Sequence, residues 1–265
     1  MKLLTFIIPI KHKDNIKDKD KFMSNLSQTI SSICNQTNTN WNAVIVVNKE
    51  TPLPYIPPEI YVKYVDLPSN KFYEKDSSND VKKFQDAVKL DKGTRVLEGI
   101  KHVSDSMYYM VVDDDDLISC NITQFVYENS DNLGWVIKYG YLWNDCGKIL
   151  YKINDFNNLC GTSLIIRSDL YKLIGVNENI SINCIKNVLG SHIDITEILQ
   201  KKEIILDELP FRGAIYRVGH ACSHSKNKKI WRHFFKIKLL INPLLLFKEI
   251  LKIRWLTERI RGTFF

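Results

Sequence analysis

Four consecutive aspartates follow an apolar stretch near the middle of the chain. The apolar residues run from Tyr108 to Val112, and the aspartates occupy positions 113–116. A continuous apolar run is typical of a strand buried in a parallel sheet, and open α/β sheets bind ligands beyond the carboxyl ends of such strands. Hard divalent cations take carboxylate oxygens together with substrate phosphates. The stretch therefore favours a metal and diphosphate site at a strand end, and a solvated acidic turn that caps the next segment is the alternative.

The composition fits one large folded domain, with or without an appendage. The chain has 265 residues, of which 45% are apolar and 25% are charged, so it can bury a core. Its six cysteines are scattered without a CxxC pair, which argues against a zinc site or a disulfide scaffold and fits a reducing compartment. The apolar start, residues 3–10, contains Pro9 and leads into Lys11, so it predicts a first strand and not a signal peptide.

The net charge of +7 is concentrated at the C-terminal end. Residues 228–265 contain ten lysines and arginines and two glutamates, which gives +8 and leaves −1 for residues 1–227. This distribution speaks against a nucleic-acid-binding face on the main body. Large apolar residues are interleaved with the cations and predict two helices, residues 230–241 and 244–260, that lie on an anionic membrane surface. Packing of these helices on the body or on a second subunit is the alternative.

Strands and helices are expected to alternate along the first part of the chain. The predicted strands are residues 4–10, 41–47, 60–65 and 108–112, with helices at 22–33 and 93–103. Residues 69–92 are polar and predict a mobile or partly helical excursion. Further on, strands are expected at 135–143, 148–153, 164–167, 203–209 and 214–218, with helices at 168–175 and 193–199. The alternation is typical of a mostly parallel sheet flanked by helices.

Four features in order carry a family resemblance. They are the strand Phe6–Ile10 with its proline, the helix end Ser32-Ile33-Cys34-Asn35-Gln36-Thr37, a second apolar strand, and the D-x-D motif Asp113-Asp114-Asp115, which Asp116 and Leu117 extend. Together they resemble family 2 glycosyltransferases of the GT-A fold, over roughly residues 3–225. The resemblance implies an α/β catalytic domain with a GT-A (Rossmann-like) sheet, residues 1–227. Residues 228–265 would then be a basic amphipathic helical tail.

The resemblance implies an enzyme that moves a sugar from a nucleotide-sugar donor to a hydroxyl of a glycan or lipid-linked acceptor. Inversion at the sugar, dependence on Mn²⁺ or Mg²⁺ and a role in surface polysaccharide or glycolipid biosynthesis are expected. In the family the last aspartate of D-x-D binds the metal and the first contacts the ribose or the metal. This assigns metal binding to Asp113 and Asp115, and nucleotide contact to Asp113 and Asp114. A bound cation would stabilise the charge of the departing diphosphate.

Five further residues are candidates for binding the nucleotide. Pro9 ends the first strand, and Asn48 stands where the family carries the first residues of "DDGS", which leaves the nucleobase open. An asparagine can still bond a base edge, because it has a donor and an acceptor. Asp91 begins a segment that resembles a basic stretch upstream of D-x-D, in which Lys92 and Arg95 are expected to face the nucleotide or its phosphates. A solvated helix start is the alternative.

Asp194 is the candidate general base. The family places an acid near the start of a late helix, and Gly190–Asp194 occupies that place with Ile193 instead of the usual glutamate. A helix N-terminus favours the ionised carboxylate, which can accept the proton of an acceptor hydroxyl. His192 is the rival base. The alternatives are a helix-capping aspartate and a structural histidine.

Two further segments resemble family elements. Gly161, within Cys160–Ser163, would let the backbone approach the acceptor sugar closely. His220 or His224, in a closing Tyr216–His224 element, would complete the metal shell. The expected location is the cytoplasm, at the inner face of the membrane. A non-catalytic relative that binds a nucleotide or glycan stays open, as does a metal-dependent nucleotidyltransferase or phosphohydrolase.

Overall fold

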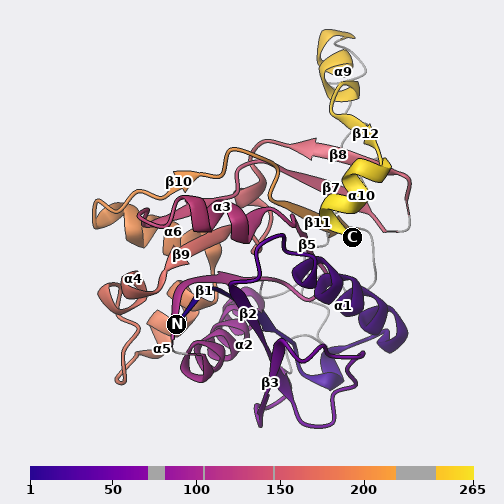
Figure 1. Cartoon of the computed structure of the whole chain (residues 1–265). Helices are drawn as coiled ribbons and strands as arrows, with labels where there is room; N and C mark the ends of the chain where they lie inside the picture. The colour runs from indigo at the N-terminus through magenta and orange to yellow at the C-terminus, as the bar shows by residue number, and fades with distance from the viewer. Residues whose placement is uncertain (71–80, 104, 146, 219–242) are drawn as a thin grey trace.

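Two β-sheets, one of seven strands and one of five, form the framework of the described chain (Figure 1). The structure, a computed structural model, describes residues 1–70, 81–103, 105–145, 147–218 and 243–265. The strand order is β10-β6-β9-β4-β1-β2-β3 in the larger sheet and β12-β8-β7-β11-β5 in the smaller one. The larger sheet carries the parallel core that the sequence predicts.

Four neighbouring strands of the larger sheet are parallel. Leu4 of β1 lies opposite Trp41 of β2 on one side and Tyr108 of β4 on the other, and Ala43 of β2 lies opposite Ile60 of β3. Beyond β4, strand β9 runs antiparallel to both of its neighbours, and β10 lies parallel to β6. The bounds are β1 Lys2–Pro9, β2 Trp41–Asn48, β3 Ile60–Val65, β4 Ser106–Val111, β6 Gly134–Val136, β9 Leu164–Arg167 and β10 Asp207–Glu208.

Helices cover both faces of this sheet. On one face, Phe6 and Ile8 of β1 share a core with Leu26 of α1 (Lys19–Cys34) and with α3 (Ile122–Glu128). On the other face, Ile7 of the same strand packs in a core with Val96 of α2. Because side chains alternate along a strand, covering both faces explains why β1 is apolar at every position from Phe6 to Pro9. The helices of the second face are α2 Val81–His102, α4 Ser168–Leu173 and α6 His192–Lys201.

The smaller sheet begins directly after the four aspartates. Strand β4 belongs to the larger sheet and β5 to the smaller, so residues 113–116 form the turn in which the chain passes between sheets. Gln36, after α1, fixes the chain beyond this turn: its amide donates to the Ser119 carbonyl (2.8 Å) and accepts from the Thr123 backbone (2.9 Å). The strands are β5 Leu117–Ile118, β7 Gly140–Asn144, β8 Ile149–Ile153, β11 Ala214–Val218 and β12 Ile253–Trp255.

Three predicted elements differ from the structure before the C-terminal region. The single strand expected at residues 135–143 is two strands, because the chain leaves the larger sheet after Val136 and enters the smaller one at Gly140. Helix α2 begins at Val81, well before the expected 93. The late strand 203–209 shortens to β10. Short helices complete the set: η1 Lys13–Asn15, η3 Phe156–Asn158, α5 Ile182–Cys184 and a π-helix, η4, Ile185–Leu189.

The helix predicted for residues 244–260 is wrong. The structure has α9 (Pro243–Ile250), then strand β12, then α10 (Glu258–Phe264). Strand β12 pairs antiparallel with β8, with Arg254 opposite Leu150, and so satisfies backbone groups at what would otherwise be a sheet edge. The helix predicted for 230–241 lies outside the described residues. Within the described part of the chain, every helix is too short or too polar to cross a bilayer.

Candidate functional site

The turn between β4 and β5 is held by its backbone. The Asp116 amide donates to the Asp113 carbonyl (3.2 Å), and the Val112 amide donates to the carbonyl of Ile7 in β1 (2.9 Å). From below, the Arg217 guanidinium donates through Nε to the carbonyl of Asp115 (3.0 Å). The side chains of Asp113, Asp114 and Asp115 are all partly exposed. Hydrogen bonds to its backbone therefore fix the turn in position.

Asp116 differs from its three neighbours because it is fully buried. Its Oδ2 accepts hydrogen bonds from Thr162 Oγ1 (2.5 Å) and from the Cys160 thiol (3.0 Å), and Thr162 Oγ1 in turn accepts from the Asp113 amide (2.9 Å). Its Oδ1 has no hydrogen-bond partner among the described residues. Burial, and then the charges of Asp115 and Asp113, raise the pKa of Asp116 well above its usual range. Asp116 thus anchors the turn from inside.

Lys92 of α2 forms an ion pair with Asp113. Burial alone would lower the pKa of Lys92, but the charge of Asp113 and the hydrogen bond to it outweigh burial and raise it, so the ammonium stays charged. Gly161 lies against the pair: a Cβ there would lie 2.6 Å from Lys92 Nζ and 2.8 Å from Asp113 Oδ2. A larger residue at this position would have to push the ends of these two side chains aside, so the glycine leaves room for the ion pair. The segment that the sequence places under the acceptor therefore lies directly at the first aspartate of D-x-D.

Arg217 connects the turn to the smaller sheet. It is fully buried, its Nη1 donates to Asp145 (2.8 Å) and its Nη2 donates to Gln28 (3.0 Å). Its guanidinium also lies over the Trp143 ring, 4.8 Å from the centroid. Burial by itself would raise the pKa of Asp145, but hydrogen bonds and ion pairs with Lys21 and Arg217 lower it. Sequence reasoning missed Asp145, whose one local signal was its place in a polar turn.

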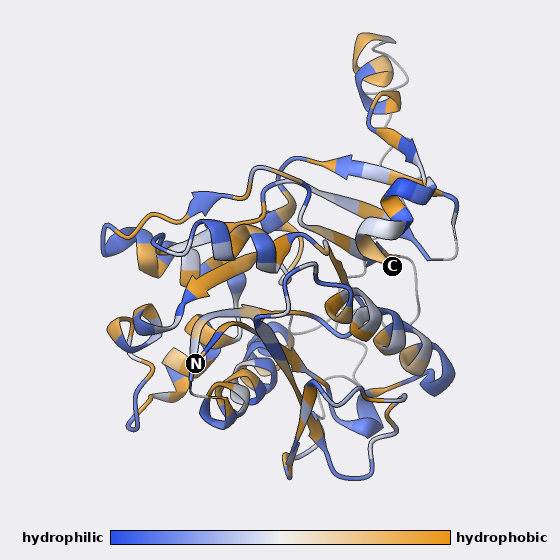
Figure 2. Cartoon of the chain, in the orientation of Figure 1, coloured by the Kyte–Doolittle hydropathy of each residue, from blue (hydrophilic) through white to orange (hydrophobic). Residues whose placement is uncertain are grey.

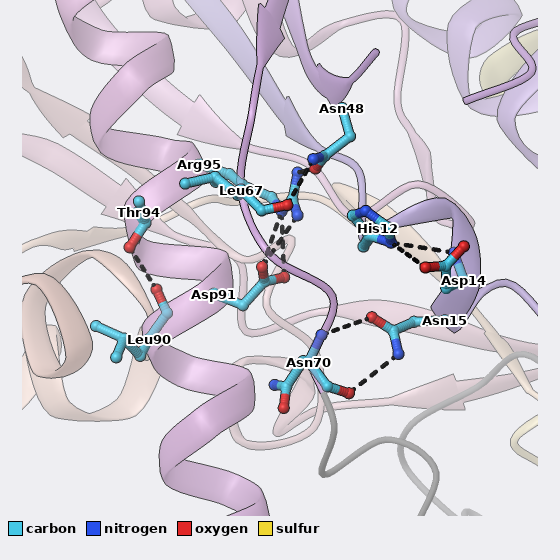
Figure 3. Close-up of polar contacts among 10 residues, drawn as sticks. All are labelled: His12, Asp14, Asn15, Asn48, Leu67, Asn70, Leu90, Asp91, Thr94 and Arg95. Carbon is cyan, nitrogen blue, oxygen red and sulfur yellow. Dashed lines mark hydrogen bonds and ion pairs between the residues drawn. The ribbon is translucent and has the colours of Figure 1, made fainter. Parts of the chain in front are cut away.

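Asn48, Asp91 and Arg95 come together at the end of β2 (Figure 3). Arg95 is 1% exposed; it donates through Nη1 to Asn48 Oδ1 (2.9 Å), through Nε to Asp91 Oδ2 (3.1 Å) and through Nη2 to Asp91 Oδ1 (3.0 Å). Asn48 donates to the Leu67 carbonyl (2.7 Å). We call these three side chains the Arg95 cluster. In this arrangement the guanidinium faces protein groups, so the predicted nucleotide contacts of Asn48 and Arg95 would require these bonds to be shared.

A second contact beside this cluster joins two loops. The side-chain amide of Asn15 donates to the Asn70 carbonyl and its oxygen accepts from the Asn70 amide, both at 3.1 Å (Figure 3). The loop after β1 is thereby tied to the loop after β3. Pro9, the last residue of β1, is buried and lies opposite Val46. The end of the parallel sheet is therefore closed by well-fixed loops on the side of Asn48.

Helix α2 meets the predicted base through a second lysine. Lys89, one turn before Lys92, forms an ion pair with Asp194 at 2.7 Å, and Ser191 caps the helix by accepting from the Asp194 amide (3.2 Å). Gly93 and Gly190 allow this approach, because a Cβ on either would collide with backbone of the opposite segment. Asp194 is 30% exposed. The sequence predicts Asp194 at a helix start but not its lysine partner.

His192 lies between these two ion pairs. Its Nε2 is buried and has no hydrogen-bond partner among the described residues. Burial, and then the nearby charge of Lys92, lower the pKa of His192 to about 4, so the imidazole is neutral at physiological pH. Together with Lys92 and Gly161 it lines a small pocket that is partly open to solvent. The other walls are mostly apolar: Val96, Val111, Leu164, Ile166, Tyr171, Val188, Leu189, Gly190, Ser191 and Ile195.

The carboxylates of the turn are possible ligands for a metal ion. In the part of the chain that is described, no group of three or more histidines, cysteines or acids has the geometry to hold one, and the predicted ligand His220 lies outside that part. Asp113 and Asp115 offer two carboxylates. Mg²⁺ is commonly held by one or two carboxylates plus substrate phosphates and water. The donor set therefore fits a cation shared with a bound diphosphate and does not fit a site made by protein alone.

Comparison with known proteins rests on structure. No family model and no curated protein matches the sequence. The crystal structure of S. aureus TarS, a GT-A glycosyltransferase, aligns with a TM-score of 0.50 and 14% identity over 82% of this chain and 37% of that chain. The chain has a GT-A-like fold. This confirms the predicted fold, and at such identity the likeness extends to the fold alone.

Two other solved structures align at lower scores. A TarS fragment, residues 1–349, gives a TM-score of 0.46 with 14% identity over 81% of this chain and 60% of that one. Francisella tularensis 2-C-methyl-D-erythritol 4-phosphate cytidylyltransferase (IspD) gives 0.41 with 11% identity over 82% and 91%. The alignment covers little more than a third of the longer TarS chain.

Proposed function

We propose that the protein is a divalent-metal-dependent glycosyltransferase that moves a sugar from a nucleotide-sugar donor to a hydroxyl of a glycan or lipid-linked acceptor, in surface polysaccharide or glycolipid biosynthesis. The observation that carries the proposal is that two lysines of one helix contact two groups, the D-x-D motif and the candidate base. Lys92 meets Asp113, and Lys89 meets Asp194, the candidate base. Metal-chelating acids, phosphate-binding cations and a base are the groups that the reaction requires.

On the donor side, Asp113 and Asp115 would hold the cation together with the diphosphate. The cation would act as a Lewis acid that stabilises the diphosphate leaving group. Once Asp113 is engaged in this way, the Lys92 ammonium is free to turn to a diphosphate oxygen, which it can bind by a charge-assisted hydrogen bond. Asp116, Thr162 and Arg217 keep the turn in place through its backbone. The hydrogen bonds of the Arg95 cluster would hold the protein surface on the nucleoside side in a fixed conformation.

On the acceptor side, Asp194 would take the proton of the attacking hydroxyl. The acceptor oxygen forms a bond to the anomeric carbon while the bond from that carbon to the diphosphate breaks, and the electron pair leaves with the diphosphate. Attack on the face opposite the leaving group inverts the configuration. Lys89 and the Ser191 cap hold Asp194 in a fixed orientation. His192 is the competing base: it is neutral, and its Nε2 has no hydrogen-bond partner among the described residues.

A donor panel tests the proposal. Purified protein with Mn²⁺ is incubated with UDP-, GDP- and CMP-sugars, and release of nucleotide is measured. We expect turnover of one donor class and loss of this turnover in Asp115→Ala. The control Asp131→Ala removes an exposed acid outside the D-x-D turn and should keep the wild-type rate. Nucleotide binding without turnover of any donor would instead indicate a binding protein. Pyrophosphate release from a nucleoside triphosphate would indicate a nucleotidyltransferase.

A further inference from the structure

Large apolar side chains are exposed along one short stretch near the C-terminus. Six of them lie between residues 244 and 255, and their exposed fractions range from 43% to 75%. Among the described residues the next largest local group is Tyr55, Tyr61 and Tyr64. Figure 2 shows the apolar colour on α9. We call this set the α9 patch: Leu244, Leu245, Phe247, Ile250, Leu251 and Trp255.

The α9 patch is presented by a firmly attached support. Strand β12 follows α9 directly and pairs with β8, and α10 then buries Phe264 against Tyr141 and Trp143 of the smaller sheet. Figure 1 shows α9 standing away from the two sheets, beyond β12. Among the described residues, attachment of the region to the body therefore uses β12 and α10, and Phe247, Ile250 and Leu251 of this stretch stay exposed. Exposed patches of this kind mark interaction surfaces.

The charge around the α9 patch indicates what covers it. Residues 243–265 contain five cations against two acids, a side-chain charge of +3: Lys248, Lys252, Arg254, Arg259 and Arg261 against Glu249 and Glu258. A second copy of the chain would bring like charges together across an interface, which costs energy. A bilayer that contains anionic lipids offers negative headgroups and an apolar layer at adjacent depths. Charge complementarity thus favours the lipid surface over a second copy.

We infer that the α9 patch docks the protein on an anionic membrane surface. Phe247, Leu251 and Trp255 enter the boundary between headgroups and acyl chains, and the surrounding cations meet lipid phosphates. The attachment is peripheral, through one face of the molecule. It does not depend on the reaction proposed above, although it would bring that site to a lipid-linked acceptor.

Vesicle flotation of the full chain tests the inference. The vesicles are phosphatidylcholine with phosphatidylglycerol, compared with phosphatidylcholine alone. We expect binding to the anionic vesicles that weakens with added salt, and an at least tenfold lower partition coefficient for the triple variant Phe247→Ser, Leu251→Ser, Trp255→Ser. The matched control replaces Tyr55, Tyr61 and Tyr64 by serine and should bind like the wild type.

The charges are tested separately. Lys248→Glu with Arg259→Glu should weaken binding to anionic vesicles while thermal unfolding, followed by circular dichroism, stays at the wild-type midpoint; both side chains are exposed. Equal flotation of the triple variant and the wild type would overturn the inference. The inference would also be overturned if the wild type did not bind vesicles and sedimented as a dimer, while the triple variant sedimented as a monomer. The α9 patch would then be a self-association surface.

Discussion

Two groups of polar residues contact the same helix, α2, and they are built in opposite ways. In the Arg95 cluster, Arg95 and Asn48 are buried, and the guanidinium and the Asn48 amide both bond to protein partners. One turn earlier along the helix, Lys92 pairs with Asp113 of the turn after β4, and the two side chains stay 24% and 31% exposed. Near this pair, Asp116 Oδ1 and His192 Nε2 are buried and have no hydrogen-bond partner among the described residues. The first group is complete in itself, and the second is not.

The difference distinguishes residues that support the structure from residues that could bind a ligand. A fully bonded buried network rigidifies the surrounding chain, whereas unpaired buried polar atoms cost energy and persist where a ligand or function requires them. Our proposal therefore assigns ligand contact to Lys92, Asp113 and His192. Arg95, Asn48 and Asp91 hold the strand ends and α2 in the positions that this surface needs. Each prediction below tests one side of this distinction.

The largest effect is expected at Asp194. An asparagine keeps the shape and the Ser191 cap but cannot accept a proton, so Asp194→Asn should lower kcat by about 10²- to 10⁴-fold. Glu197→Gln, an exposed position one turn later, is the matched control and should be neutral. His192→Asn should cost less than about tenfold by the same measure. The reverse ranking, with His192→Asn the more damaging, would make the histidine the base.

Arg95→Met should be the most destabilising substitution among these residues. It leaves Asp91, which is 12% exposed, without its cation, and breaking a largely buried ion pair by removing one partner costs up to about 3–5 kcal/mol. Urea unfolding measures the loss. Arg167→Met removes a more exposed pair with Asp169 and should cost about 0–1 kcal/mol. Equal, small losses in the two variants would contradict the supporting role of the Arg95 cluster.

The low pKa of His192 predicts how stability depends on pH. Its pKa is about 4 in the folded chain, against an ordinary 6.5, so the unfolded chain binds more protons between these values. Stability should therefore fall as pH falls from 6.5 towards 4, by about 2–3 kcal/mol in the wild type. His192→Asn should show a flatter profile across this window, measured by urea unfolding at several pH values. An unchanged slope in the variant would mean that the histidine is not buried uncharged.

The smallest effect concerns competition at Asp113. Lys92 is a cation held at a carboxylate assigned to the metal, so Lys92→Met should raise Mn²⁺ affinity about two- to fivefold, because the pair is partly exposed. Nucleotide affinity should change in the opposite direction, since a phosphate-binding group is lost. Lys89→Met makes the same charge change one turn away and should leave Mn²⁺ affinity as it is. Equal Mn²⁺ binding in all three proteins would remove Lys92 from the site.

Much of the parallel sheet could be predicted from local pattern. Strands β1, β2, β4, β9 and β11 occur close to where the apolar runs place them, because a strand buried on both faces leaves a continuous signal. Strand β3, which is partly exposed, also occurs where it is predicted. Elements decided by distant partners could not be predicted. Residues 253–255 form a strand only because β8 offers its edge, and residues 134–144 divide because two sheets meet there.

The candidate site follows the same rule. The D-x-D turn at the end of β4 could be predicted because its residues are adjacent in the sequence. Lys92, 21 positions before Asp113, could be predicted through the family resemblance of its own segment. The burial of Arg95 could not, because its partner Asn48 lies 47 positions away on β2. The pairing of Lys89 with Asp194 spans 105 positions. This pairing also requires that α2 begin before Lys89. The helix begins at Val81, in a polar stretch without the apolar periodicity that would predict a helix.

The most direct test of the central claim is calorimetric titration of nucleoside diphosphates with and without Mn²⁺. The account predicts that UDP, GDP or CDP binds more tightly with Mn²⁺. It also predicts that Asp115→Ala abolishes this dependence in a folded protein, because the carbonyl of residue 115, not its side chain, bonds to Arg217. The same Mn²⁺ dependence in wild type and Asp115→Ala would contradict it, since the D-x-D turn would then not be where cation and diphosphate meet.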